Sequence, residues 1–145
     1  MNTTGEIIGA VHGLFGLLWI VMLLWLTVNL SAYKLTYREE LNHGIRMSSV
    51  LARVTGGLAI IIGLILFAAS SFFAIHIAVA SISGIILLAG IVLAIIAYAV
   101  IGEGFLMRNL KRLDSENSSS AVRFSIYETL LAMITLVLMF VGTYL

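Results

Sequence analysis

The feature that most constrains this chain is an apolar stretch, from Val54 to Gly102, that contains no aspartate, glutamate, lysine or arginine. A helix needs about 20 apolar residues to cross a bilayer, so this stretch is too long for one crossing and fits two with a tight turn between them. Hydrophobic residues make up 61% of the sequence and charged residues 10%, whereas a soluble domain carries roughly 25% charged residues. The sequence therefore predicts an integral membrane protein, with the lipid bilayer as its surroundings.

Further apolar stretches near both ends of the chain bring the predicted number of membrane spans to four. The predicted helices cover about residues 7–30, 50–70, 74–101 and 122–145. Ser70 and Ser71 are the predicted turn between the second helix and the third. Because the connections leave no room for a globular domain, we predict an all-α fold, a single four-helix transmembrane bundle over residues 1–145.

The basic residues are distributed unevenly and predict the orientation of the bundle. All eight lie in or beside the first and third connections, at Lys34, Arg38, Arg46, Arg53, Arg108, Lys111, Arg112 and Arg123. Cytoplasmic loops carry an excess of lysine and arginine, so we expect the polar stretches 31–49 and 102–121 in the cytoplasm and both termini outside. No eukaryotic targeting segment is apparent, so the expected location is a prokaryotic cytoplasmic membrane.

Composition excludes several kinds of site. The sequence contains no cysteine, which excludes disulfides, thiolate metal sites and iron–sulfur clusters. Its net charge is +1 and its basic residues form no block or tail, so we expect no nucleic-acid partner.

Two histidines, His12 and His76, are predicted inside the membrane, where polar residues are costly and often functional. Each lies a few residues into a helix that begins outside, so both imidazoles are expected at similar depth near the outer leaflet. Neutral imidazole is a common axial ligand of haem iron, and two histidines on facing helices could hold a b-type haem. The alternative is that each histidine is hydrogen-bonded to a neighbouring helix. His43, in the first polar stretch, is expected to be solvated.

Small residues surround both predicted ligands. Gly16 and Trp19 follow His12 on its own helical face, and Ala80 follows His76 in the same way. Each histidine would therefore have a flat surface beside it, where a planar macrocycle could lie. The alternative is that the glycines only let the helices pack closely.

A second pair of polar residues is predicted toward the other membrane face. Arg53 lies about one turn inside the second helix, and Glu128 lies at a similar depth inside the fourth. Pairing would lower the cost of burying either charge. The pair is either a salt bridge that orients the helices or part of a proton, quinone or haem-propionate site. Glu103 is expected at the interface, at the end of the third helix.

Three short motifs resemble the CopD and HemJ-type group of small membrane proteins. The segment Val11-His12-Gly13-Leu14-Phe15-Gly16-Leu17-Leu18-Trp19 is similar to that group's first-helix signature, in which tryptophan follows histidine after seven residues. Ile75-His76-Ile77 and Tyr127-Glu128-Thr129 are similar to its third and fourth helices.

The resemblance implies a haem-b-binding bundle, and for the HemJ-type branch it implies protoporphyrinogen oxidation. Ala78 stands where that branch has lysine, Tyr127 stands where it has asparagine, and its helix-two proline is missing. These differences weigh against the oxidase reaction.

The leading hypothesis is a b-type haem protein in electron transfer, with His12 and His76 as the iron ligands. Gly16, Trp19, Ala80 and Arg53 complete the predicted cofactor site. We expect it to serve as a subunit of a larger respiratory or redox complex or as a homo-oligomer, with a quinone as a candidate redox partner. If the protein is catalytic, it is expected to be an oxidoreductase.

Two other functions remain open. One is a cofactor-free accessory subunit of a membrane complex. The other is a CopD-like metal-handling or transport protein, although the methionines that a copper path would need are scattered along the chain.

Overall fold

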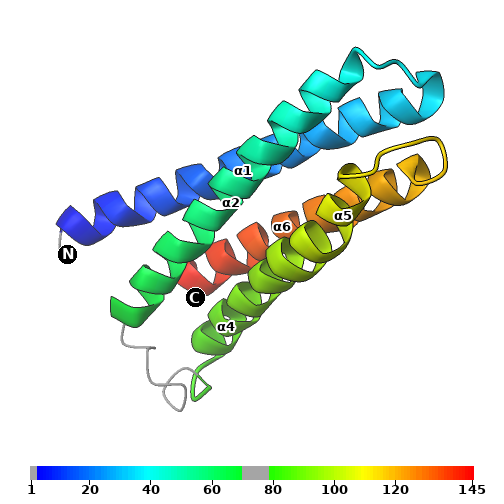
Figure 1. The fold of residues 1–145 in the computed structure, drawn as a ribbon. Helices are drawn as coiled ribbons and strands as arrows, with labels where there is room; N and C mark the ends of the chain where they lie inside the picture. The colour runs from blue at the N-terminus through cyan, green and yellow to red at the C-terminus, as the bar shows by residue number, and fades with distance from the viewer. Residues whose placement is uncertain (1–2, 70–78) are drawn as a thin grey trace.

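The computed structural model describes residues 3–69 and 79–145, and in this part of the chain all regular structure is helical (Figure 1). The helices are α1 (Thr3–Thr36), α2 (Leu41–Ala69), α4 (Ile82–Ile95), η1 (Ile96–Leu106), α5 (Met107–Leu110) and α6 (Ser118–Tyr144). The third, fourth and fifth of these run on without a break, so they form one third span over Ile82–Leu110. Within residues 3–69 and 79–145, four helices are thus long and apolar enough to cross a membrane, which confirms the predicted all-α membrane bundle.

The helices alternate in direction, so one end of the bundle holds both ends of the described chain and the other holds two connections between helices. α1 packs mainly against α2, the third span packs against α6, and α1 also packs against α6. We call the end that holds Thr3 and Tyr144 the terminal end. The opposite end, which holds the connections 37–40 and 111–117, is called the loop end (Figure 1).

The helices extend beyond the predicted apolar segments at the loop end. α1 runs to Thr36 and α2 begins at Leu41, so most of the stretch 31–49 is helical. Tyr37, with a φ of 50°, ends α1 in the left-handed conformation, and its N–H donates to the carbonyl of Tyr33 over 2.7 Å. Hydropathy predicts only the apolar part of a helix. The same helix can continue into the membrane interface through charged and polar residues, so its ends lie beyond the apolar part.

The third span differs most from the prediction. It begins at Ile82, because the Ser81 hydroxyl caps it by accepting a hydrogen bond from the N–H of Gly84 over 3.0 Å. Ala80 therefore lies in the turn before the helix, and its predicted place on a helical face is wrong. The predicted turn at Ser70 and Ser71 lies outside the described residues.

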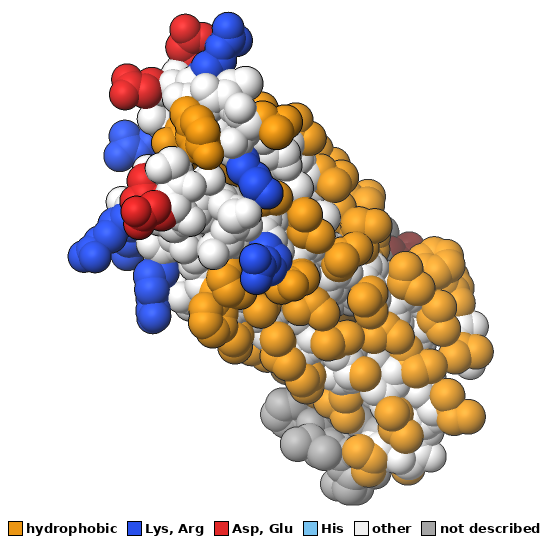
Figure 2. Space-filling view, turned by 90° about the vertical axis from the view of Figure 1, so that its right-hand side faces the viewer, with side chains coloured by type: hydrophobic (Ala, Val, Ile, Leu, Met, Phe, Trp, Pro, Cys, Tyr) orange, Lys and Arg blue, Asp and Glu red, His pale blue; other side chains and the backbone are white. Residues whose placement is uncertain are grey.

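The surface of the bundle is apolar along most of its length. Figure 2 shows most of the visible charged side chains gathered at one end, while hydrophobic side chains cover much of the rest of the visible face. Val28, Val137 and Ile82 are among the large apolar residues that are more than half exposed. Such a surface suits a lipid bilayer, where exposed apolar side chains carry no cost.

Candidate functional site

A cavity of about 350 Å³ lies between the helices toward the terminal end of the bundle. Its wall is mainly apolar, and the residues with polar side chains that line it are His12, Trp19, Thr135, Thr143 and Tyr144. An apolar pocket with a few convergent polar groups is the usual form of a small-molecule site. At the loop end the interior is instead filled by an aliphatic cluster around Leu26 and Leu30.

His12 stands on the wall of this cavity with one ring nitrogen unused. Its Nδ1 atom is buried and has no hydrogen-bond partner. The ring packs against α2 at Gly63, where a Cβ atom would lie 2.7 Å from the His12 Cε1 atom, and the imidazole also interacts with the backbone of Ala59 through a hydrogen bond. The glycine thus admits the imidazole between α1 and α2.

The glycines of α1 leave open space beside His12. A Cβ atom added to Gly9 or Gly13 would meet no atom within 4 Å, and one added to Gly16 would meet only a methyl group of Leu136, at 4.0 Å. All three glycines line the cavity. The flat small-residue surface predicted beside His12 is therefore present.

Trp19 closes the inner end of the cavity. Its side chain is 3% exposed, and the indole packs so closely on α2 that a Cβ atom at Gly56 would lie 2.8 Å from its Nε1 atom. That Nε1 atom makes no hydrogen bond of ordinary geometry, but the indole N–H acts as a weaker donor to the carboxylate of Glu128. Tyr98 meets the indole edge-on, with ring centroids 6.1 Å apart.

Behind Trp19, the predicted pair of Arg53 and Glu128 is present. The Arg53 Nη2 atom donates to the Glu128 Oε1 atom, and the two side chains are 11% and 0% exposed. Arg53 and Tyr98 also make two hydrogen bonds with each other, and each residue is the side-chain donor in one of them. Its Nη1 atom donates to the Tyr98 carbonyl over 3.2 Å, and the Tyr98 hydroxyl donates to the Arg53 carbonyl over 3.0 Å.

The third span approaches this ion pair through the wide turns of η1. A Cβ atom at Gly102 would overlap the Arg53 guanidinium and lie 2.7 Å from the Glu128 Oε1 atom. The Glu103 carboxylate lies 3.8 Å from the Arg53 Nη1 atom and is 47% exposed. Its predicted place at a helix end is wrong, since the helix continues past Glu103 to Leu110. π-helical turns are rare and often mark functional sites.

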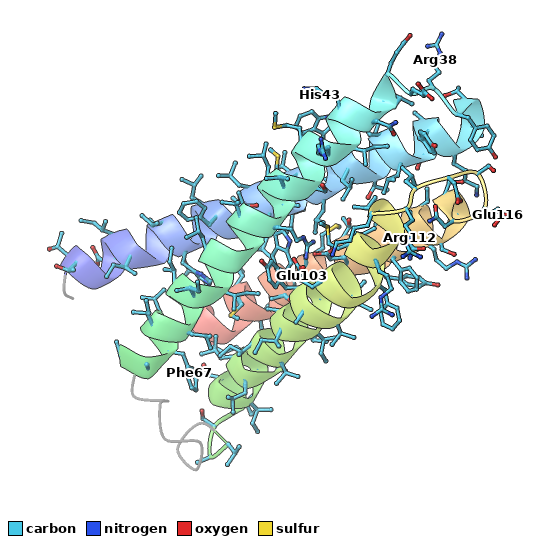
Figure 3. All side chains as sticks on the ribbon, viewed as in Figure 1. Arg38, His43, Phe67, Glu103, Arg112 and Glu116 are labelled. Atoms are coloured by element: carbon cyan, nitrogen blue, oxygen red, sulfur yellow. The ribbon has the colours of Figure 1, made fainter. Side chains whose placement is uncertain are left out.

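The structure brings together only part of the predicted cofactor site. His12, Gly16 and Trp19 line one cavity, but Arg53 does not reach it because Glu128 and Tyr98 hold its guanidinium. Ala80 is exposed in a turn, and His76 lies outside the described residues. His43 is exposed toward the loop end, as predicted (Figure 3).

Two residues of the ion-pair site were missed by the sequence reasoning. Tyr98 and Gly102 lie in an apolar run, and the signal for them is weak: a phenol and a glycine just before a lone carboxylate. Their role depends on the π-helical register, which turns Gly102 toward Arg53.

Comparison of the chain with protein-family models, curated proteins and solved structures gives no significant match. The resemblance to the CopD and HemJ-type group therefore stays a hypothesis that rests on its short motifs.

Proposed function

We propose that this chain is a b-type haem-binding membrane protein that works in electron transfer. The observation that carries the proposal is the unpartnered ring nitrogen of His12, buried on the wall of an apolar cavity. A buried polar atom without a partner costs roughly 1–3 kcal/mol, and coordination of an iron atom would remove that cost.

The residues around His12 fit a porphyrin. Among residues 3–69 and 79–145 no three acidic, histidine or cysteine side chains form a metal-binding group. A haem does not need such a group, because the macrocycle supplies the equatorial ligands and the protein supplies axial ones. The open glycine surface at Gly9 and Gly13 leaves room for a planar ring. His76 is the proposed second ligand.

The chain's own residues would position the cofactor and separate it from the rest of the bundle. A bound haem supplies one-electron oxidation and reduction. Gly63 admits the His12 ring, the mainly apolar wall would surround the macrocycle, and Trp19 stands at the inner end. An apolar environment is one of the protein's means of setting a haem potential.

The setting of this function is also part of the proposal. The basic residues favour a prokaryotic cytoplasmic membrane in which the loop end, with the connections 37–40 and 111–117, faces the cytoplasm and the terminal end faces outward. The protein is further proposed to work as a subunit of a larger redox complex or as a homo-oligomer. A quinone is the candidate redox partner.

Absorption spectra of the detergent-purified protein test the haem. After expression with ample haem, we expect a sharp reduced α-band of the b type and a positive pyridine haemochrome assay. His12→Ala should lose the band, because the ring nitrogen that ligates iron is gone. His43→Ala is the matched control and should keep it, since His43 is exposed far from the cavity. A folded but colourless wild-type protein would contradict the proposal and favour the cofactor-free accessory subunit.

A gentler change in the same site is Gly63→Ala. The new methyl group would lie 2.7 Å from the His12 Cε1 atom, so the imidazole must shift. We expect a lower haem content and a displaced α-band, with a loss of stability of about 1–3 kcal/mol from overpacking. Gly5→Ala is the control, because a Cβ atom there meets nothing within 4 Å. Equal haem content and equal spectra in the two variants would show that Gly63 does not position His12.

A further inference from the structure

Buried polar atoms without a hydrogen bond of ordinary geometry gather in and behind the cavity. In the described part of the chain there are five such side-chain atoms: His12 Nδ1, Trp19 Nε1, Arg53 Nε, Glu128 Oε2 and Thr135 Oγ1. Three of these residues line the cavity, and the other two form the ion pair behind its inner end.

The cavity and the ion pair are close neighbours. Ala132 lines the cavity and lies one helical turn from Glu128 on the same face of α6. Trp19 also lines the cavity and lies beside the Glu128 carboxylate. The free Oε2 atom of Glu128 is therefore separated from the cavity by little more than the indole ring.

We propose that the inner part of the cavity is a hydrated passage that connects the terminal end of the bundle to the buried Glu128 carboxylate. Water is the expected ligand, because each unpartnered atom is a hydrogen-bonding group and buried water is found where several such groups converge. A purely aliphatic cavity of the same size would stay dry. The passage ends at the ion pair, since the aliphatic cluster around Leu26 and Leu30 fills the interior beyond it.

Water at this place would give Glu128 a route for exchanging protons with the aqueous phase. The charged and titratable groups that face it are Arg53 from α2 and Glu103 and Tyr98 from η1. A hydrated passage from one end only would restrict that exchange to one side of the membrane.

Cysteine accessibility tests the passage, and the absence of native cysteine makes the chain a clean background. Thr135→Cys and Ala132→Cys are placed on the cavity wall of the otherwise intact protein in lipid vesicles, and a small charged methanethiosulfonate is added. The matched controls are Val137→Cys and Ile134→Cys, on the 60% and 48% exposed outer positions of the same helix. Gly5→Cys, at the terminal end, is the positive control.

We expect the cavity positions to react at least roughly tenfold faster than the lipid-facing ones, because the thiolate is the reactive species and needs water to form. The reaction is measured in the wild-type background and with His12→Ala, which lacks the haem under the proposed function. Faster reaction at Thr135→Cys in either background supports the passage. Rates equal to those of Val137→Cys in both backgrounds, with Gly5→Cys reacting, overturn it and leave the haem proposal untouched.

Discussion

Replacement of Arg53 by methionine is expected to remove much of the stability of the folded bundle. Methionine keeps the length of the side chain but leaves the Glu128 carboxylate, which is 0% exposed, without its cation. Breaking a buried ion pair from one side costs about 3–5 kcal/mol, because the remaining charge stays buried and uncompensated. The Tyr98 carbonyl also loses the donor that lies 3.2 Å away. Thermal and denaturant unfolding in detergent would measure the loss.

The two partners of the pair are not expected to be equivalent. Glu128→Leu should cost less than Arg53→Met, because Arg53 retains Glu103, whose carboxylate lies 3.8 Å from its Nη1 atom. The double variant Arg53→Met/Glu128→Leu should recover most of the stability, since apolar replacement of a whole buried pair is often neutral or stabilising. Arg123→Met, at an exposed position of α6, is the control and should change stability by no more than about 0.5 kcal/mol.

A double-mutant cycle with Arg53→Met and Glu128→Leu tests whether the two side chains stabilise each other. If the losses of the two single variants simply add in the double variant, the side chains do not interact and the pair contributes nothing to stability. A large recovery would show that the cost arises from an unpaired charge rather than from lost packing.

The fold was largely predictable because the bilayer imposes one simple requirement on the sequence. A span must be long and apolar, so the charge-free run ending at Gly102 predicted two crossings. The pairing of Arg53 with Glu128 was also predictable, because the alternation of helix direction puts residues at similar distances from the loop end at similar depth. The ends of the helices were not predictable, since a helix continues past its apolar part into the interface.

The lining of the cavity was predictable only where it depends on one helix. His12, Gly16 and Trp19 share a face of α1 by their spacing alone, and they share the cavity. The role of each glycine could not be predicted in this way, because it depends on which side chains of the neighbouring helix lie against it. Gly9 faces open space, whereas Gly56 is covered by an indole ring. The sequence does not distinguish these two positions, because both are glycine.

Gly102→Ala is expected to damage the ion pair without changing either of its members. The added Cβ atom would overlap the Arg53 guanidinium and lie 2.7 Å from the Glu128 Oε1 atom, so the two side chains must separate or η1 must move away. Overpacking of a buried site costs about 1–3 kcal/mol, and full separation of the pair would add the larger cost of two unpaired charges.

Gly104→Ala is the matched control, because it changes the same residue type in the same π-helical segment. A Cβ atom at Gly104 would have only an ordinary contact of 3.5 Å with the Ala99 carbonyl, so alanine should stabilise by about 0.5–1 kcal/mol through the lower entropy of the unfolded chain. Unfolding measurements should therefore move in opposite directions for the two variants. In the Arg53→Met/Glu128→Leu background the loss of stability caused by Gly102→Ala should be smaller, since the guanidinium and the carboxylate that the added Cβ atom would overlap are absent. An unchanged penalty there would mean that Gly102 is required by the π-helical backbone itself and not by the ion pair.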